Sequence, residues 1–358
     1  MFFFPSKNNT FSASYLFSVA IVLFAVNQLV SWLVMIYLGN EFSDFCTRDC
    51  NWYRSIMVDG YQLEPHAHEK RDAANWAFFP LFPLVAGLIN EVPWISSNMA
   101  LLLTGRAFLL VSIYLFIIFS LVYAKNINPY IAGMALALNP YSLYGNVGYS
   151  EPIFLTLTLL SFLAIAQEKF KIAGIWSGLL TAARPVGIAI GFSFVIYALF
   201  NRSKVIKRKA DFALGLALVP LGIFLFMVYI YSVTGDALAF KHVQVAWGRI
   251  PEFPLNHLTN IIDSRLSLVY GISVILSFAA IGVLVWLKLW HLAAFSFLAT
   301  LIPLSTGLWE MPRYIWWQAP ILFVLALIMN YRKLYLIIIP AMVLASISIN
   351  ILWLTYPL

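Results

Sequence analysis

The stretch that decides the fold is residues 13–38, ASYLFSVAIVLFAVNQLVSWLVMIYL, which contains no charged residue. A membrane-spanning helix needs about 20 predominantly apolar residues, so this stretch is long enough to cross a bilayer. It is far longer than the roughly 7 to 15 apolar residues at the centre of a signal peptide. We therefore predict a spanning helix here rather than a cleavable leader.

The composition extends this prediction to the whole chain. Of its 358 residues, 62% are hydrophobic and only 10% are charged, and the mean hydropathy is +0.86. Soluble domains carry about 25% charged residues, so a soluble globule is excluded. We predict an all-α, polytopic membrane protein with a single integral domain, residues 1–358. The net charge of +7 then reflects the two sides of a membrane and not nucleic-acid binding.

The apolar segments predict about eleven transmembrane helices. They cover residues 13–38, 99–124, 129–147, 151–167, 172–184, 186–200, 212–232, 265–287, 291–308, 315–330 and 334–353. Residues 76–90 are short, and Pro80 and Pro83 would break a helix unless it starts there, so we predict an interfacial or re-entrant helix. Arg184-Pro185 divides 172–200 into two helices, because a charge within the membrane is costly and a proline ends a helix.

The basic residues support this division of the chain. With the N-terminus in the cytoplasm, the predicted inner segments hold twelve Lys and Arg residues against two acids, Glu168 and Asp211. Such an excess is typical of cytoplasmic loops. The basic run 202–209 is predicted to determine topology, and binding of an anionic lipid or a partner is the alternative. The outer face then receives two large loops, residues 39–98 and 233–264.

The first outer loop carries the strongest candidate for chemistry. It contains Arg48-Asp49-Cys50-Asn51-Trp52-Tyr53, just beyond the first span. An enzyme that moves a sugar onto a hydroxyl needs a carboxylate to take the acceptor proton, and a membrane-edge site can receive a lipid-linked donor. Trp52 and Tyr53 can stack on sugar rings. The alternative is an ordinary interfacial loop with solvated acids and an aromatic belt.

Two further polar groups lie at predicted helix ends on the same side. Glu151 complements the dipole of a helix start, or acts with Tyr149 to hold the acceptor or orient Asp49. Arg184 lies between two apolar runs, where a charge needs a polar cavity or a fixed anion. A phosphate suits it, because arginine binds phosphate with two parallel hydrogen bonds. An internal salt bridge, for instance to Glu151, is the alternative.

The later outer segments add a second group of candidates. Gln244, Trp247 and Arg249 belong to a basic and aromatic loop, and Arg313 opens a span. The two arginines are predicted to contact a lipid phosphate, and the alternative is that they snorkel to the interface. Neither a phosphate-binding glycine loop nor a paired-histidine metalloprotease motif occurs, which disfavours a nucleotide-driven or proteolytic enzyme.

Cysteines and acids leave two questions open. Cys46 and Cys50 form a disulfide in an oxidising compartment or remain two thiols, and a zinc site with His66 and His68 is a weaker alternative. No metal site is predicted from a motif. A requirement for Mg²⁺ or Mn²⁺ stays open, because several acids of the outer face could supply the oxygen ligands that these ions accept. These acids are Asp44, Asp49, Asp59 and Glu151.

Taken in order, several motifs carry a family likeness. They are Asp49, Trp52-Tyr53, Gly60-Tyr61, AFFPLFP at 77–83, NPYS at 139–142, YSE at 149–151, ARPVG at 183–187, Ala239-Phe240, Gln244, AWGR at 246–249 and PRY at 312–314. This combination resembles the PIG-V mannosyltransferase family over residues 45–315. The compact chain favours a bacterial relative.

The resemblance implies a GT-C type glycosyltransferase fold, a polyprenyl-phosphate sugar as donor, and inversion at the anomeric carbon. Asp49 would be the catalytic base, and the predicted substrate-binding residues are Trp52, Tyr53, Tyr149, Glu151, Arg184, Gln244, Trp247, Arg249 and Arg313. The predicted reaction moves a hexose to a hydroxyl of a glycolipid, glycan or protein. Mannose is the leading candidate for this hexose. The reaction would take place at the periplasmic side of a bacterial inner membrane. The alternative function is a secondary transporter or flippase for a lipid-linked sugar, although no internal repeat is visible.

Overall fold

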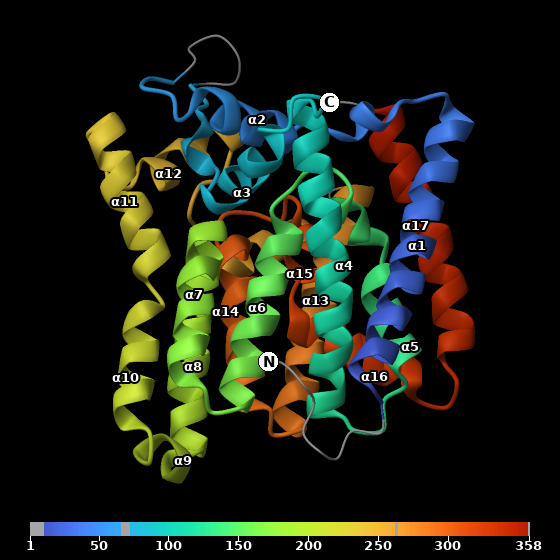
Figure 1. Ribbon diagram of the computed structural model, residues 1–358, viewed down its shortest axis with the longest axis vertical. Coiled ribbons are helices and arrows are strands. Elements are labelled where there is room, and N and C mark those ends of the chain that lie inside the picture. Colours follow the sequence, from blue (N-terminus) through green and yellow to red (C-terminus); the bar gives the residue numbers. More distant parts are fainter. Residues whose placement is uncertain (1–10, 66–71, 262–263, 357–358) are drawn as a thin grey trace.

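The computed structural model describes residues 11–65, 72–261 and 264–356, and every element within these ranges is a helix. Most of the longer helices run along the vertical of Figure 1 and pack into one bundle. The chain is therefore all-helical, as predicted.

The α-helices are α1 (Ala13–Leu38), α2 (Asp49–Asp59), α3 (Leu81–Asn90), α4 (Ser97–Tyr123), α5 (Pro129–Ala137), α6 (Glu151–Ala166), α7 (Phe170–Ala183), α8 (Ala189–Phe200), α9 (Arg202–Ile206), α10 (Lys209–Leu218), α11 (Leu221–Thr234), α12 (Ala239–His242), α13 (Arg265–Trp286), α14 (Trp290–Leu304), α15 (Met311–Ile315), α16 (Ala319–Asn330) and α17 (Tyr335–Thr355). Short 3-10 helices lie between them: η1 (Phe42–Phe45), η2 (Asn75–Ala77), η3 (Pro140–Gly145), η4 (Pro185–Ile188), η5 (Val243–Trp247) and η6 (Pro254–Asn260).

Length and apolar composition make this a multi-pass membrane protein. Among the described residues, five helices are long and apolar enough to cross a membrane: α1, α4, the pair α10 and α11 taken together, α13 and α17. Six shorter apolar helices accompany them, α3, α6, α7, η4 with α8, α14 and α16. The total of eleven spans stays a prediction.

Two segments that were predicted as single spans contain shorter helices. Segment 129–147 is α5 followed by η3, because Pro140 cannot continue the helix. In segment 315–330, α16 begins only at Ala319, after an extended Gln318 and with Pro320 in its first turn. Uninterrupted hydrophobicity overestimated helix length at these two places. Segment 212–232 has a short irregularity at Val219 and Pro220, but α10 and α11 together remain one candidate span, Lys209–Thr234.

The predicted break at Arg184 is confirmed. Helix α7 ends at Ala183, and Arg184 has an extended backbone with φ −157° and ψ 141° before Pro185 opens η4. A residue before proline avoids the helical region because the proline ring clashes with it. The break therefore turns the chain back toward α8 and leaves a charged side chain at the turn.

Different short helices lie at the two ends of the bundle. Helices α2, α3 and α12 gather at the upper end in Figure 1, whereas α9, which carries Arg202 and Lys204, lies at the lower end. Helix α3 begins directly after Pro80 and holds Pro83 in its first turn, where a missing N–H removes no helical hydrogen bond. Which end faces the cytoplasm stays a prediction from the charges.

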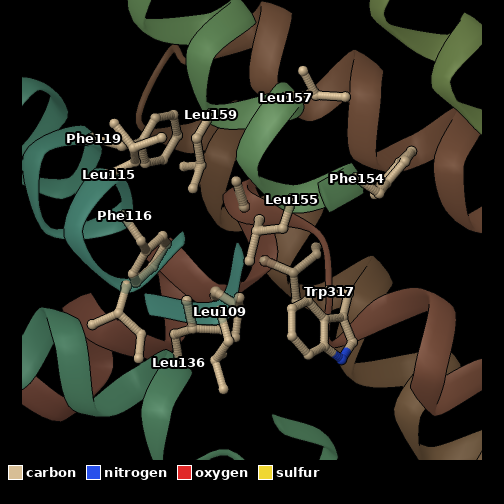
Figure 2. Close-up of a cluster of buried hydrophobic side chains, with 14 of the residues drawn as sticks. Leu109, Leu115, Phe116, Phe119, Leu136, Phe154, Leu155, Leu157, Leu159 and Trp317 are labelled. Atoms are coloured by element: carbon tan, nitrogen blue, oxygen red, sulfur yellow. The ribbon is translucent and has the colours of Figure 1, made fainter. Parts of the chain in front are cut away.

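The core lies around α4 and α6 and is closely packed. Figure 2 shows the large apolar side chains that meet there. They are Leu109, Leu115, Phe116 and Phe119 of α4, Leu136 of α5, Phe154, Leu155, Leu157 and Leu159 of α6, and Trp317 just before α16. This rigid centre supports the start of α6, which carries Glu151.

A buried amide network joins α1 to the η3 region. The Asn27 side chain donates to the Ser142 hydroxyl at 2.9 Å, and the Gln28 side chain donates to Asn146 Oδ1 at 2.7 Å. Asn146 in turn donates to Asn27 Oδ1 at 3.0 Å and to Ser31 at 3.1 Å. Hydrogen bonds between helices satisfy polar groups that could not reach water inside a membrane. The network therefore holds η3, and the chain that follows it, against α1.

Candidate active site

An open cavity of about 530 Å³ lies between α2, α12, α15 and the turn that follows α7. Its wall combines aromatic and proline side chains with a concentration of charge. The charged residues that line it are Asp49, Arg184, Lys241, Arg249, Glu310 and Arg313. Four of these six were predicted to belong to one site, and they come from segments up to 264 positions apart.

Asp49 is the first residue of α2 and borders this cavity. Its carboxylate oxygen Oδ2 accepts a hydrogen bond from Arg313 Nη1 at 2.5 Å, and its backbone N–H donates to the Tyr149 hydroxyl at 3.1 Å. The side chain remains 23% exposed. The carboxylate is thus held from one side and open to the cavity on the other.

A disulfide secures the chain just before Asp49. Cys46 and Cys50 are bonded, so the bridged alternative of the sequence analysis is confirmed. The bridge closes a tight turn in which Arg48 has a positive φ of 56°. A Cβ atom at Gly148 would lie 2.6 Å from Cys50 Sγ, so the disulfide rests directly against the residue before Tyr149. The start of α2 is thereby fixed against the chain that enters α6.

Glu151 is the buried centre of the ion cluster. It opens α6 and has no exposed surface, and its Oε1 forms salt bridges to Arg184 Nη1 at 2.5 Å and to Arg313 Nε. The alternative of an internal salt bridge between Arg184 and Glu151 is therefore confirmed. Glu151 Oε2 has no hydrogen-bond partner among the described residues.

Arg313 lies in the turn between α14 and α16 and is shared by three carboxylates. Besides Asp49 and Glu151, Glu310 Oε2 accepts from its Nη1 at 3.1 Å, and the Tyr149 ring lies 4.4 Å from its guanidinium. Burial alone would lower the pKa of the Arg313 guanidinium, but Glu151, Asp49 and Glu310 raise it well above its ordinary value. Arg313 thus stays charged and organises the acids around it.

Arg184 and Arg249 lie against a common aromatic ring. Their guanidinium carbons are 5.1 Å and 5.3 Å from the centre of the Tyr314 ring. Arg249 is 3.8 Å from Glu310 Oε2, beyond hydrogen-bond distance. The positive charge of Arg249 is therefore less neutralised by protein carboxylates than that of Arg313. Arg249 also lines the cavity.

Aromatic side chains form another part of the wall. Tyr53 lines the cavity, and its hydroxyl is 2.7 Å from the Ser150 hydroxyl. Trp247 lines it as well and meets both Trp52 and Phe78 edge to face, at 5.7 Å and 5.9 Å between ring centres. Trp52 stacks on Phe78, at 5.9 Å between ring centres, and contacts Trp247, but it does not itself line the cavity.

Gln244, the remaining predicted site residue, lines the cavity, and its side chain donates to the Phe240 carbonyl at 3.3 Å. Sequence reasoning missed Glu310 and Lys241 as site residues. A signal was present for Glu310, because it lies three residues before Arg313 in the same turn. Its role depends on a side-chain direction that spacing does not reveal.

The four acids proposed as metal ligands do not converge. Asp44 caps η1 by accepting from the backbone N–H of Glu41, and Asp59 lies at the far end of α2. Among the described residues, no group of three or more His, Cys, Asp or Glu side chains could hold a metal ion. His66 and His68, the other residues of the zinc alternative, lie outside the described residues, and both cysteines are in the disulfide.

The chain was compared with known families, curated proteins and solved structures. No family model and no curated protein matches it. The crystal structure of ArnT from Cupriavidus metallidurans bound to undecaprenyl phosphate is similar, with a TM-score of 0.50 and 15% identity over 86% of this chain and 59% of ArnT. The Archaeoglobus fulgidus oligosaccharyltransferase, crystallised in complex with Zn and sulfate, gives a TM-score of 0.51 and 12% identity over 94% of this chain and 53% of that chain.

This chain therefore spans somewhat more than half the length of each of these two proteins. At such low identity the likeness establishes the fold alone. Both structures belong to the GT-C class, so the chain has a GT-C type fold, as predicted.

Proposed function

We propose that this protein is a GT-C glycosyltransferase that moves a hexose from a polyprenyl-phosphate donor to a hydroxyl acceptor at the extracytoplasmic face of a membrane. The observation that carries the proposal is the position of Asp49. Its carboxylate borders an open cavity of about 530 Å³ whose wall also holds Arg184, Arg249 and Lys241. A base and several cations facing one space suit a reaction that deprotonates a hydroxyl and releases a phosphate.

In the proposed reaction, Asp49 takes the proton of the acceptor hydroxyl. The hydroxyl oxygen forms a bond to the anomeric carbon from the side opposite the phosphate, and the bond from that carbon to the phosphate oxygen breaks. The phosphate leaves with the electron pair, so the configuration at the anomeric carbon is inverted. Arg313 binds Oδ2 of Asp49, which leaves Oδ1 to face the acceptor.

The leaving phosphate gains negative charge and needs cations that are not already neutralised. We assign this role first to Arg249, which is 3.8 Å from Glu310 and makes no hydrogen bond to it. Arg184 lies beside the same Tyr314 ring and lines the cavity, but it already pairs with Glu151, so its proposed contribution is smaller. Arg313, which was grouped with them on sequence grounds, has three carboxylate partners. Its proposed role is to hold Asp49 and Glu151 in place.

The sugar and acceptor would meet the aromatic part of the wall. Tyr53 and Trp247 line the cavity, and Trp52 supports Trp247. Gln244 offers an amide on the same side. Aromatic rings present apolar faces to sugars and amides bind hydroxyls, so these residues are proposed to select the hexose. Tyr149 is proposed to orient Asp49 through its hydroxyl.

The proposed donor lipid and the proposed sugar rest on different kinds of evidence. ArnT, whose structure is similar, was crystallised with undecaprenyl phosphate, which supports a polyprenyl phosphate as the carrier. Mannose and the PIG-V family rest on the ordered motifs alone. We further propose that residues 1–358 form one integral domain in a bacterial inner membrane, with the N-terminus in the cytoplasm and loops 39–98 and 233–264 outside.

The test is a transfer assay with the full-length protein in lipid nanodiscs and polyprenyl-phosphate mannose, with the glucose donor in parallel. Asp49→Asn should reduce transfer or donor hydrolysis by roughly 10²- to 10⁴-fold, because it removes the general base. Asp59→Asn is the matched control, since Asp59 lies exposed at the other end of α2. Near-normal turnover by Asp49→Asn would contradict the proposal.

Mass spectrometry of the lipids that co-purify tests the donor class separately. A polyprenyl phosphate or its sugar ester is the expected finding. Movement of a lipid-linked sugar across the bilayer without any bond cleavage would instead support the alternative of a flippase.

A further inference from the structure

Glu310 and Asp49 share one nitrogen atom of Arg313. Arg313 Nη1 lies 2.5 Å from Asp49 Oδ2 and 3.1 Å from Glu310 Oε2. The Arg313 side chain is almost fully buried, whereas Glu310 is 31% exposed and lines the cavity. The two N–H groups of Nη1 serve one carboxylate each, so both anions draw on the positive charge of the same guanidinium and repel each other across it.

The backbone at Glu310 adopts a conformation that is uncommon for a glutamate. Its φ of 61° and ψ of 16° lie in the left-handed region, which residues with a Cβ other than Asn and Asp rarely adopt. Glycine adopts this region without a steric penalty, and Gly307 in the same turn has a positive φ of its own. Six other described non-glycine residues, Glu168 and Lys288 among them, also have a positive φ, so this conformation is a supporting observation and the contacts of Glu310 with two arginines carry the argument.

The second partner of Glu310 is the cation that faces the cavity. Arg249 Nη2 is 3.8 Å from Glu310 Oε2, so the two charges attract each other without a hydrogen bond. An anionic donor that binds Arg249 would take this attraction away from Glu310. Glu310 would then turn fully to Arg313 Nη1.

We propose that Glu310 is a positioning residue that controls how firmly Arg313 holds Asp49, and that it loosens Asp49 when the donor phosphate occupies Arg249. The inference rests on the proposed function. Without Glu310, Asp49 would be the sole carboxylate on Nη1 and would be a weaker base. With Glu310 present, the base becomes available when the sugar donor is in place.

A Glu310 substitution leaves the other titratable and charged groups around Asp49 in the protein, although Arg249 and Arg313 each lose one carboxylate partner. These groups are Tyr53, Tyr149, Glu151, Arg184, Lys241, Arg249 and Arg313. A change of pH dependence in a Glu310 variant can therefore be assigned to one removed negative charge.

The experiment measures the pH dependence of transfer by full-length Glu310→Gln. Removing a negative charge stabilises the ionised Asp49, so the acidic limb of kcat/KM should move down by about one pH unit. A weaker base should lower kcat at neutral pH by about 3- to 10-fold. The KM for the donor should not rise, because Arg249 loses a competing anion. Glu310→Asp, which keeps the charge, should restore most of kcat.

Infrared spectroscopy gives a readout that needs no turnover. The carbonyl stretch of protonated Asp49 is the band that disappears in Asp49→Asn, and its titration midpoint should fall by the same amount, about one pH unit, in Glu310→Gln. Glu252→Gln is the control, since Glu252 is an exposed acid outside the ion cluster. An unshifted midpoint would overturn the inference, whereas a wild-type protein that transfers no sugar would overturn only the proposed function.

Glu310→Gly separates this role from a structural one. Glycine suits the left-handed conformation, so the melting temperature should be equal to or higher than that of the wild type while kcat falls as in Glu310→Gln. A pH profile that superimposes on the wild type, or a raised KM with unchanged kcat, would show that Glu310 does not act through Asp49.

Discussion

This protein contains two buried polar clusters. Both satisfy polar side chains inside the helical bundle, but they do so in different ways. The amide network of Asn27, Gln28, Ser31 and Asn146 is neutral, lies between α1 and η3, and exchanges hydrogen bonds among its own members. The ion cluster around Glu151 contains full charges, draws its members from α2, α6, α15 and the turn after α7, and opens to a cavity.

The difference shows what each cluster is for. Neutral amides that bond one another stabilise contacts between helices, and they need neither water nor a ligand. Buried charges are costly, and replacing them with apolar residues often leaves a protein equally stable or more so. A chain that keeps charges beside an open cavity therefore has a use for them beyond folding.

The largest expected effect comes from removing the centre of the ion cluster. Glu151→Gln takes the carboxylate from Arg184 and Arg313, whose side chains are 13% and 4% exposed. An uncompensated buried charge costs about 3–5 kcal/mol of unfolding free energy. Chemical unfolding in detergent micelles measures it, and transfer should be lost as well. An unchanged unfolding free energy would mean that water reaches this cluster.

The amide network should respond more weakly and without loss of function. Asn146→Ala removes three hydrogen bonds and leaves their partners inside the bundle, which should cost about 1–3 kcal/mol. Transfer per folded molecule should stay at the wild-type level. A drop in kcat would contradict the purely structural role of the amide network, because it would link the network to Tyr149 and Asp49.

Arg249 should affect binding and not stability. Its pair with Glu310 spans 3.8 Å, so Arg249→Gln should leave the melting temperature unchanged. The KM for the donor should rise about tenfold, which corresponds to about 1.4 kcal/mol. A titration of transfer rate against donor concentration distinguishes this from a fall in kcat, which would contradict a role in donor binding.

The smallest effect belongs to a solvent-facing ion pair at the opposite end. Lys171 and Asp211 are 3.0 Å apart with side chains 55% and 40% exposed. Lys171→Ala should change the unfolding free energy by about 0–1 kcal/mol, because exposed pairs are screened by water. A larger loss would show that this pair is shielded by lipid.

The sequence predicted the fold class and much of the site, for identifiable reasons. Hydrophobic runs are local, so the long apolar helices could be predicted, and Pro80 marked the start of the short helix α3. Arg184-Pro185 combines a charge and a proline, which are two local signals of a helix end. Helix α7 ends directly before them. The end of α5 before Pro140 was missed because apolar residues continue on both sides of that proline.

The pairing of the site residues could not be predicted in the same way. Spacing suggested that Arg313 binds a phosphate, but its three carboxylate partners come from positions 49, 151 and 310. Glu310 was overlooked because only its backbone conformation and side-chain direction bring it to Arg313. The disulfide between Cys46 and Cys50 was one of three open alternatives, beside two free thiols and a zinc site, until the turn between them was known.

By itself, the sequence determined that this chain enters a membrane as a helical bundle and that its polar candidates belong to one side, since hydropathy and charge are properties of neighbouring residues. Only the tertiary structure decided which acid meets which arginine at Asp49. The contacts of Arg313 with Asp49 and Glu151 join residues more than a hundred positions apart, and their energies depend on distance and burial, which exist only in the folded chain.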